Sequence, residues 1–261
     1  MTNSRAIVAA QKLSWECGLR DPLQLPIKTI VQSLGIVYKE EEIDGADGRI
    51  LIKKNSAVIT VNSRIELQSK KRFVIAHELG HFILHRDNLR VYNDTEETLN
   101  QWYQENYTSA EQEANEFAAE FLMPSELFYK ECKDKIFDPE VIDDLAERFQ
   151  VSKTATILRF VKEGNYPVCV VYCKDNKMKW FKRPDNARGY LLFEKDSPPP
   201  SGSVASELYE KDIHYFGSDR RQAVWKSTWF KLNRDEKDTT IYEYCIYVRS
   251  YDYAISVIWE D

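Results

Sequence analysis

The 261-residue sequence lacks the features of a membrane, secreted or strongly basic protein. No apolar run approaches the roughly 18 residues of a membrane helix, and the N-terminus has no apolar stretch typical of a secretory signal. The net charge is −6, so the chain as a whole lacks the excess of Lys and Arg that neutralises nucleic-acid phosphates. A local basic patch is still compatible with this charge. These absences predict a cytoplasmic protein with no membrane partner.

Cysteine is scarce as well, with five residues that are scattered and include no C-x-x-C pair. This pattern is typical of reduced thiols in a cytosolic protein rather than of a disulfide framework. Cys169 and Cys173 fall on one side of an expected strand, because side chains alternate along a strand. We expect plain buried thiols there, with a redox or metal role as the alternative.

The pattern of apolar residues changes once along the chain, near Gly164. Before it the pattern is largely helical, and after it alternating runs rich in Tyr, Val, Trp and Phe predict strands. The sequence therefore predicts an α+β protein with three parts: 1–130, 131–164 and 165–261. The elements expected in the first two parts are helices at 4–17, 26–34, 69–86 and 109–122, strands at 49–52 and 57–62, an irregular segment at 87–108, and two short helices within 138–163.

Three of the four histidines lie within nine residues, as His77, His81 and His85. Helical residues four apart share a face, so His77 and His81 can direct both imidazoles at one ion. Glu78 stands beside that position and is suited to take a proton from a metal-bound water. Zinc lowers the pKa of such a water toward about 7. The spacing predicts a Zn²⁺ site with Glu78 as catalytic base; the alternative is two surface histidines on an amphipathic helix.

A catalytic zinc ion usually has three protein ligands. His85 is a poor third ligand, because it lies about 12 Å from His77 along a straight helix, and we expect it to cap or pack at the helix end. Glu111 on the second strong helix is the favoured ligand, with Glu113 as the alternative. Asn115 shares the face of Glu111 and is expected to accept a hydrogen bond from a ligand histidine.

Small residues on the second helix predict close packing against the first. Ala114 and Ala118 would let that helix approach the metal-binding helix at Gly80. Glu116 and Glu120 are expected to lie on a solvated face.

Two stretches resemble the ImmA/IrrE family of metallopeptidases: residues 72–85, R-F-V-I-A-H-E-L-G-H-F-I-L-H, and residues 111–124, E-Q-E-A-N-E-F-A-A-E-F-L-M-P. The second stretch is far more specific than H-E-x-x-H alone. The similarity covers residues 1 to about 163. It implies a thermolysin-like zincin fold in which His77, His81 and Glu111 are zinc ligands and Glu78 is the base.

The resemblance also implies a substrate and a role. The chain is similar to endopeptidases that cut a partner helix-turn-helix (XRE-like) repressor at one site. The cut derepresses genes for stress responses, mobile elements or phage defence. Family members often carry a C-terminal sensory domain compared to GAF domains, so we expect 165–261 to sense a small-molecule or nucleic-acid signal.

Residues 144–160 resemble the helix-turn-helix-like segment that the family commonly has after its catalytic helices. Its second helix offers Lys153, Thr154, Thr156 and Arg159 to a DNA groove. That set is thin for phosphate contacts and the preceding helix is acidic, so an interaction surface or core packing is favoured over DNA binding.

Several alternatives remain open from the residues alone. The protein could be a DNA- or protein-binding regulator with a silent metal site, although the intact Glu78 argues against this. A group of C-terminal aromatic residues with basic neighbours could bind single-stranded nucleic acid, but a β core with a basic rim is favoured. The aromatic residues are Tyr215, Phe216, Trp225, Trp229 and Phe230, and the basic ones are Arg220, Arg221, Lys226 and Lys231. A substrate segment is expected to run along the 57–62 strand if that strand is an open edge. Tyr103 and Tyr107 are candidates for stabilising the oxyanion.

Overall fold

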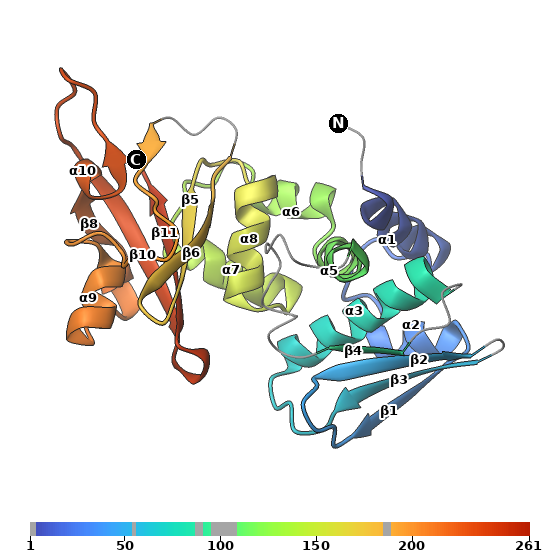
Figure 1. Ribbon diagram of the computed structural model, residues 1–261. Helices are drawn as coiled ribbons and strands as arrows, with labels where there is room; N and C mark the ends of the chain where they lie inside the picture. The colour runs from blue at the N-terminus through green and yellow to red at the C-terminus, as the bar shows by residue number, and fades with distance from the viewer. Residues whose placement is uncertain (1–3, 54–55, 87–90, 95–108, 185–188) are drawn as a thin grey trace. The chain divides into compact units, whose positions relative to one another are not determined.

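The computed structural model describes residues 4–53, 56–86, 91–94, 109–184 and 189–261 (Figure 1). The chain divides into two compact units, each described here by itself. The first comprises Met1–Phe128 and Ala146–Ser152, and the second Tyr129–Leu145 and Lys153–Asp261. Among the helices described, none is both long and apolar enough to cross a lipid bilayer. The mixed α+β class, with a helical region and a β-rich C-terminal part, is confirmed.

The first unit contains a four-stranded sheet in the order β1-β3-β2-β4. Strand β1 pairs in parallel with β3, and β2 pairs antiparallel with both β3 and β4. The expected β2–β3 hairpin is confirmed, whereas β1 was not expected and β4 lies inside the segment expected to be irregular. The strands are β1 (Ile36–Glu41), β2 (Gly48–Lys53), β3 (Ser56–Asn62) and β4 (Val91–Asp94).

The four helices expected in this unit are confirmed, and three of them contact the fourth, α3. Helix α3 packs against α5 and also contacts α1, α2, β2 and β3. Its middle is enclosed on all sides, because Val74 to His81 are all buried. The helices are α1 (Arg5–Glu16), α2 (Ile27–Ser33), α3 (Gln68–His85) and α5 (Ser109–Leu122), followed by α6 (Ser125–Cys132).

Helices α3 and α5 approach closely at Gly80. A Cβ atom on Gly80 would lie 3.1 Å from the Cα atom of Ala114 and 3.2 Å from the Cβ atom of Phe117. The close packing predicted at Ala114 is therefore confirmed, and Ala118 is fully buried. The absence of a side chain at Gly80 brings the start of α5 next to the histidines of α3.

Glu120 corrects one expectation about α5. Its side chain is buried and accepts hydrogen bonds from Gln11 Nε2 and from the backbone N–H and hydroxyl of Ser125. The start of α6 needs an acceptor for its free N–H groups, and Glu120 supplies it from the preceding helix. The prediction of a solvated face was wrong for Glu120; Glu116 is exposed as expected.

The second unit is built on an antiparallel five-stranded sheet in the order β6-β5-β11-β10-β8. One face of the sheet packs around Trp229 and against α9 (Val204–Lys211). The strands are β5 (Cys169–Lys174), β6 (Lys177–Lys182), β8 (Gln222–Trp225), β10 (Thr240–Val248) and β11 (Tyr253–Trp259). The remaining short elements are β7 (Tyr190–Leu191), α10 (Lys226–Trp229), β9 (Phe230–Lys231) and two 3₁₀ helices, Gly217–Arg220 and Arg249–Tyr251.

The two cysteines singled out from the sequence are part of this core. Cys169 and Cys173 are buried and form no disulfide. Burial raises the pKa of Cys169 to about 11 and that of Cys173 to about 12, so both are neutral thiols at pH 7. The expectation of plain buried thiols is confirmed.

The aromatic residues near the C-terminus divide into two groups. Trp229 and Phe230 belong to the core, as the favoured interpretation predicted. Phe216 and Trp225 are instead 75% and 61% exposed, so the core interpretation was wrong for these two.

Helix α7 (Pro139–Phe149) and helix α8 (Lys153–Glu163) form the expected helical pair. Three of the four side chains proposed to reach a DNA groove are engaged within the protein. Thr156 and Arg159 are buried, and Lys153 forms an ion pair with Asp143 at 2.6 Å. This arrangement supports the packing interpretation of the segment over DNA binding.

Candidate metal centre

Three side chains from α3 and α5 meet at one point. His77 and His81 lie one turn apart on α3, and their Nε2 atoms are 2.9 Å apart. The Oε2 atom of Glu111, in the first turn of α5, lies 3.2 Å from Nε2 of His77 and 3.3 Å from Nε2 of His81. The histidines are buried, and Glu111 is partly exposed. The structure thus brings together the three residues that the sequence nominated as metal ligands.

The electrostatics of this cluster favour an ionised carboxylate. Burial alone would raise the pKa of Glu111, but hydrogen bonds and charge interactions with His77 and His81 outweigh it and hold the pKa well below its usual range. Glu111 is therefore an anionic oxygen donor beside two imidazoles.

The donor atoms fit a tetrahedral metal ion. A zinc ion with bonds of about 2.0–2.1 Å holds its ligand atoms about 3.3–3.4 Å apart. The three atoms here are separated by 2.9, 3.2 and 3.3 Å. Two imidazole nitrogens and one carboxylate leave one coordination position free, which is the donor set of catalytic rather than structural zinc sites.

Asn115 orients the first histidine as expected. Its Oδ1 atom accepts a hydrogen bond from Nδ1 of His77 at 2.8 Å, and both residues are buried. A carbonyl oxygen can only accept, so Nδ1 carries a proton, and in the neutral His77 ring Nε2 is the nitrogen whose lone pair can bind a metal ion.

His85 and Glu113 have a partnership that the sequence reasoning missed. Nδ1 of His85 lies 3.2 Å from Nδ1 of His81, and Nε2 of His85 lies 2.8 Å from Oε2 of Glu113. Glu113, the alternative third ligand, therefore contacts His85 and is not part of the three-residue cluster. The i,i+4 spacing from His81 to His85 was the available signal, because it places the two rings on one face of the helix.

Glu78 lies against the sheet. Its side chain is fully buried, and a Cβ atom placed on Gly48 of β2 would lie 2.8 Å from Oε1 of Glu78 and 2.4 Å from Cγ1 of Val74. Only glycine at this position of β2 leaves room for the Glu78 carboxylate in the conformation seen. The two tyrosines considered for the oxyanion, Tyr103 and Tyr107, lie outside the described residues.

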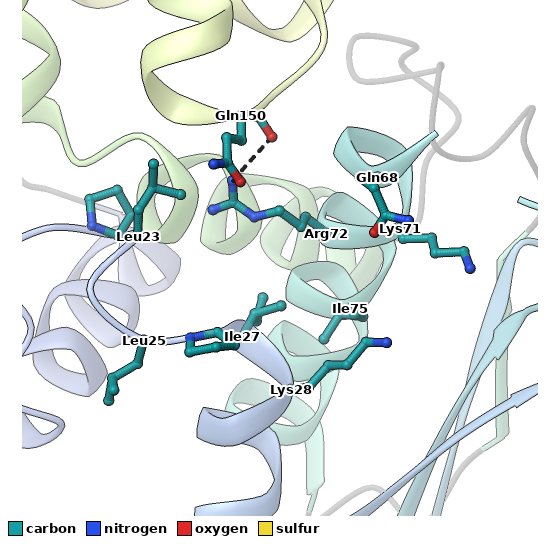
Figure 2. A pocket seen from close by; sticks show the side chains of 11 residues that line it. Leu23, Leu25, Ile27, Lys28, Gln68, Lys71, Arg72, Ile75 and Gln150 are labelled. Atoms are coloured by element: carbon teal, nitrogen blue, oxygen red, sulfur yellow. Dashed lines mark hydrogen bonds between the residues drawn. The ribbon is translucent and has the colours of Figure 1, made fainter. Parts of the chain in front are cut away.

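A separate pocket of about 290 Å³ lies beside α2 and the N-terminal half of α3 (Figure 2). Its cationic side chains are engaged with groups of the protein. Lys28 and Lys71 both donate to Glu40, and Arg72 donates to the backbone oxygens of Phe149 and Gln150. The cationic side chains of the pocket therefore mainly hold neighbouring elements together. We take the cluster of His77, His81 and Glu111, and not this pocket, as the candidate active site.

Comparison with known proteins agrees with this site. Residues 31–160 match the family model described as Peptidase_M78, IrrE N-terminal-like domain. The matched family is a peptidase family, and its members are metalloenzymes. Through this domain the chain belongs to the ImmA/IrrE family.

The other two comparisons add information on the fold alone. No curated protein matches the chain. Among solved structures, a Mycobacterium tuberculosis transcriptional regulator is similar, with a TM-score of 0.61 and 16% sequence identity. The match covers 99% of this chain and 77% of that one. At this identity the similarity shows a shared fold and does not transfer a function.

Proposed function

We propose that this protein is a zinc-dependent endopeptidase with a thermolysin-like zincin domain. His77, His81 and Glu111 are the proposed ligands of Zn²⁺, and Glu78 is the proposed catalytic base. The observation that carries the proposal is the convergence of two Nε2 atoms and one carboxylate oxygen within 3.3 Å of one another. Glu78 follows His77 in the helix, is buried, and would supply the proton acceptor that peptide hydrolysis needs.

Each residue has a defined task in this mechanism. Bound zinc would supply a Lewis acid for the scissile carbonyl and a water with a pKa near 7. Glu78 accepts the proton of the attacking water and returns it to the leaving amine. Asn115 holds the ring of His77, and Gly48 leaves the space in which the Glu78 carboxylate lies.

The route of the substrate differs from the one expected from the sequence. Strand β3 is paired on both edges, with β1 and β2, so the open-edge condition fails and no substrate strand can add there. Strands β1 and β4 are the two outer strands of the described sheet, and β4 pairs with β2, the strand whose Gly48 lies against Glu78. An extended substrate segment adding to β4 would use main-chain hydrogen bonds for affinity and side-chain pockets for specificity.

The proposed substrate is a helix-turn-helix, XRE-like repressor cut at one specific site. Membership of the ImmA/IrrE family supports this choice, because the family resemblance implies such a substrate. The cut would derepress stress, mobile-element or phage-defence genes in the cytoplasm. In this proposal residues 1–130 are the peptidase domain, 131–164 a helix-turn-helix-like segment, and 165–261 a sensory, GAF-like domain for a small-molecule or nucleic-acid signal.

The alternative is a DNA- or protein-binding regulator whose metal site has no catalytic task. A regulator needs ligands but no base, so a buried glutamate directly after His77 in the helix favours the peptidase.

The test compares wild type with Glu78→Gln, a nearly isosteric change that removes the base. Both proteins, loaded with zinc, are incubated with a lysate of the source organism, and new protein N-termini are identified by mass spectrometry. We expect one cut in a helix-turn-helix repressor with wild type and none with Glu78→Gln. If zinc-loaded wild type produces no new N-terminus, or if both proteins produce the same ones, the regulator alternative replaces the peptidase.

A further inference from the structure

His85 is the last residue of α3, and it lies between the proposed metal ligand His81 and the carboxylate of Glu113 on α5. Its side chain is 5% exposed, and its two ring nitrogens lie near different partners. Nδ1 is 3.2 Å from Nδ1 of His81, and Nε2 is 2.8 Å from Oε2 of Glu113. Glu113 is about one-third exposed and lies 4.0 Å from the guanidinium of Arg5 on α1.

These contacts determine which ring nitrogens of His81 and His85 carry a proton. A carboxylate only accepts, so Nε2 of His85 carries a proton toward Glu113. In a neutral His85 ring Nδ1 then has a lone pair and accepts a proton from Nδ1 of His81. In a neutral His81 ring Nε2 is then the nitrogen whose lone pair can bind a metal ion, and it lies beside Glu111 and His77. Through this row of hydrogen bonds, the carboxylate of Glu113 determines that Nε2, and not Nδ1, is the His81 nitrogen available to a metal ion.

We propose that His85 and Glu113 are positioning residues that hold His81 in the Nδ1-protonated form and fix the direction of its Nε2 lone pair. The proposal rests on the proposed zinc site and extends it. Neither residue touches the cluster atoms; both act through His81.

The two proposed ligand histidines are therefore oriented in different ways. His77 donates to the neutral amide of Asn115, whereas His81 donates to a second imidazole that is itself bound to a carboxylate. Outer hydrogen-bond partners of this kind hold the ligand ring and raise its basicity, and their loss typically costs about 10–100-fold in metal affinity. A residue that only packs at the helix end would have no such effect.

The test measures zinc affinity by competition with a chromophoric chelator in wild type and five variants, one of which is the ligand variant Glu111→Ala. His85→Phe keeps a ring but removes the acceptor, and we expect a loss of about 10–100-fold. His85→Asn is the matched control, because its Oδ1 atom stands near the position of Nδ1 and can accept from His81. We expect His85→Asn to stay within about three-fold of wild type. Glu113→Leu is expected to weaken binding more than Glu113→Gln, which keeps an acceptor oxygen.

A second readout reports the tautomer and does not depend on zinc. Long-range ¹H–¹⁵N spectra of histidine-labelled protein distinguish protonated from unprotonated ring nitrogens. We expect Nδ1 of His81 to be protonated in wild type and in His85→Asn, and to lose this preference in His85→Phe. His214, in the second unit, serves as the internal reference.

The outcomes separate this inference from the function on which it rests. If wild type binds zinc, Glu111→Ala abolishes binding and His85→Phe binds like wild type with an unchanged His81 tautomer, only the positioning role is wrong. If wild type binds no zinc, the metallopeptidase is wrong, and the ¹⁵N spectra alone then decide whether His85 sets the tautomer of His81. Should His85→Phe fail to fold, equal zinc affinity in Glu113→Leu and Glu113→Gln would overturn the proposal.

Discussion

The contact between β2 and α3 makes a sharp prediction about Gly48→Ala. The added Cβ atom would lie 2.4 Å from Cγ1 of Val74 and 2.8 Å from Oε1 of Glu78. Carbon contacts are optimal at about 3.5–4.0 Å, so the neighbouring atoms must move by about 1 Å. Val74 is β-branched in a helix and has one strongly preferred rotamer, whereas the Glu78 carboxylate is the far end of a flexible side chain. Glu78 therefore moves more readily than Val74.

The expected energies differ for stability and for catalysis. Overpacking a core costs about 1–3 kcal/mol, and replacing a strand glycine by alanine returns about 0.5–1 kcal/mol. The net loss of unfolding free energy is thus about 1–2 kcal/mol. A catalytic group displaced by about 1 Å can cost 10²-fold in rate. We expect kcat/KM to fall about 100-fold while zinc content stays at the wild-type level, because Gly48 does not touch the ligands.

The assay uses a peptide spanning the cleavage site found in the lysate experiment, with urea unfolding and zinc content measured on the same preparations. The matched control is the double variant Gly48→Ala, Val74→Ala, which removes the 2.4 Å contact and keeps the 2.8 Å contact with Glu78. It should recover stability relative to Gly48→Ala and remain slow. Wild-type kcat/KM in Gly48→Ala would refute the assignment of Gly48 as the residue that makes room for the base.

Three further outcomes follow from the contacts of the first unit. Asn115→Ala removes the acceptor of His77 and should weaken zinc binding about 10–100-fold, measured by chelator competition. Arg72→Met loses the hydrogen bonds to the end of α7 and should cost about 1–3 kcal/mol in urea unfolding; a change below the fitting error would contradict it. Hydrogen bonds from Lys28, Lys71 and Tyr38 lower the pKa of Glu40 to about 2. The stability that Glu40 contributes is therefore present above about pH 5 and lost as pH falls toward about 2. The difference in unfolding free energy between wild type and Glu40→Gln should shrink over that range, and a constant difference would contradict it.

The helices that carry the site could be predicted because their patterns are local. The apolar repeat of α3, the H-E-x-x-H spacing and the small residues of α5 lie within a few turns, and together they nominated His77, His81 and Glu111, which the structure brings together. Asn115 followed from the same periodicity, because it lies one turn after Glu111. In these helices a side chain's position follows from its place in the helix.

The elements that were missed depend on tertiary pairing. Strand β1 is polar toward its end, and its Glu40 is stabilised by lysines from α2 and α3, which no local pattern reveals. The sequence alone predicts a surface position for Glu120, because the contact of its carboxylate with the start of α6 forms only in the folded protein. The link from His81 through His85 to Glu113 requires the rotamers of two packed helices. Gly48 acts on Glu78 across 30 residues of chain.

The most direct test of the central claim is the zinc content per chain, measured by elemental analysis after metal loading and dialysis. The same measurement is made on wild type, Glu111→Ala, Glu113→Ala and Glu78→Gln. The account predicts about one zinc in wild type and in Glu78→Gln, and none in Glu111→Ala. Glu113→Ala should retain zinc after loading but lose it more readily on dialysis. Zinc kept in Glu111→Ala and lost in Glu113→Ala would contradict the ligand set, and no zinc in wild type would contradict the metallopeptidase itself.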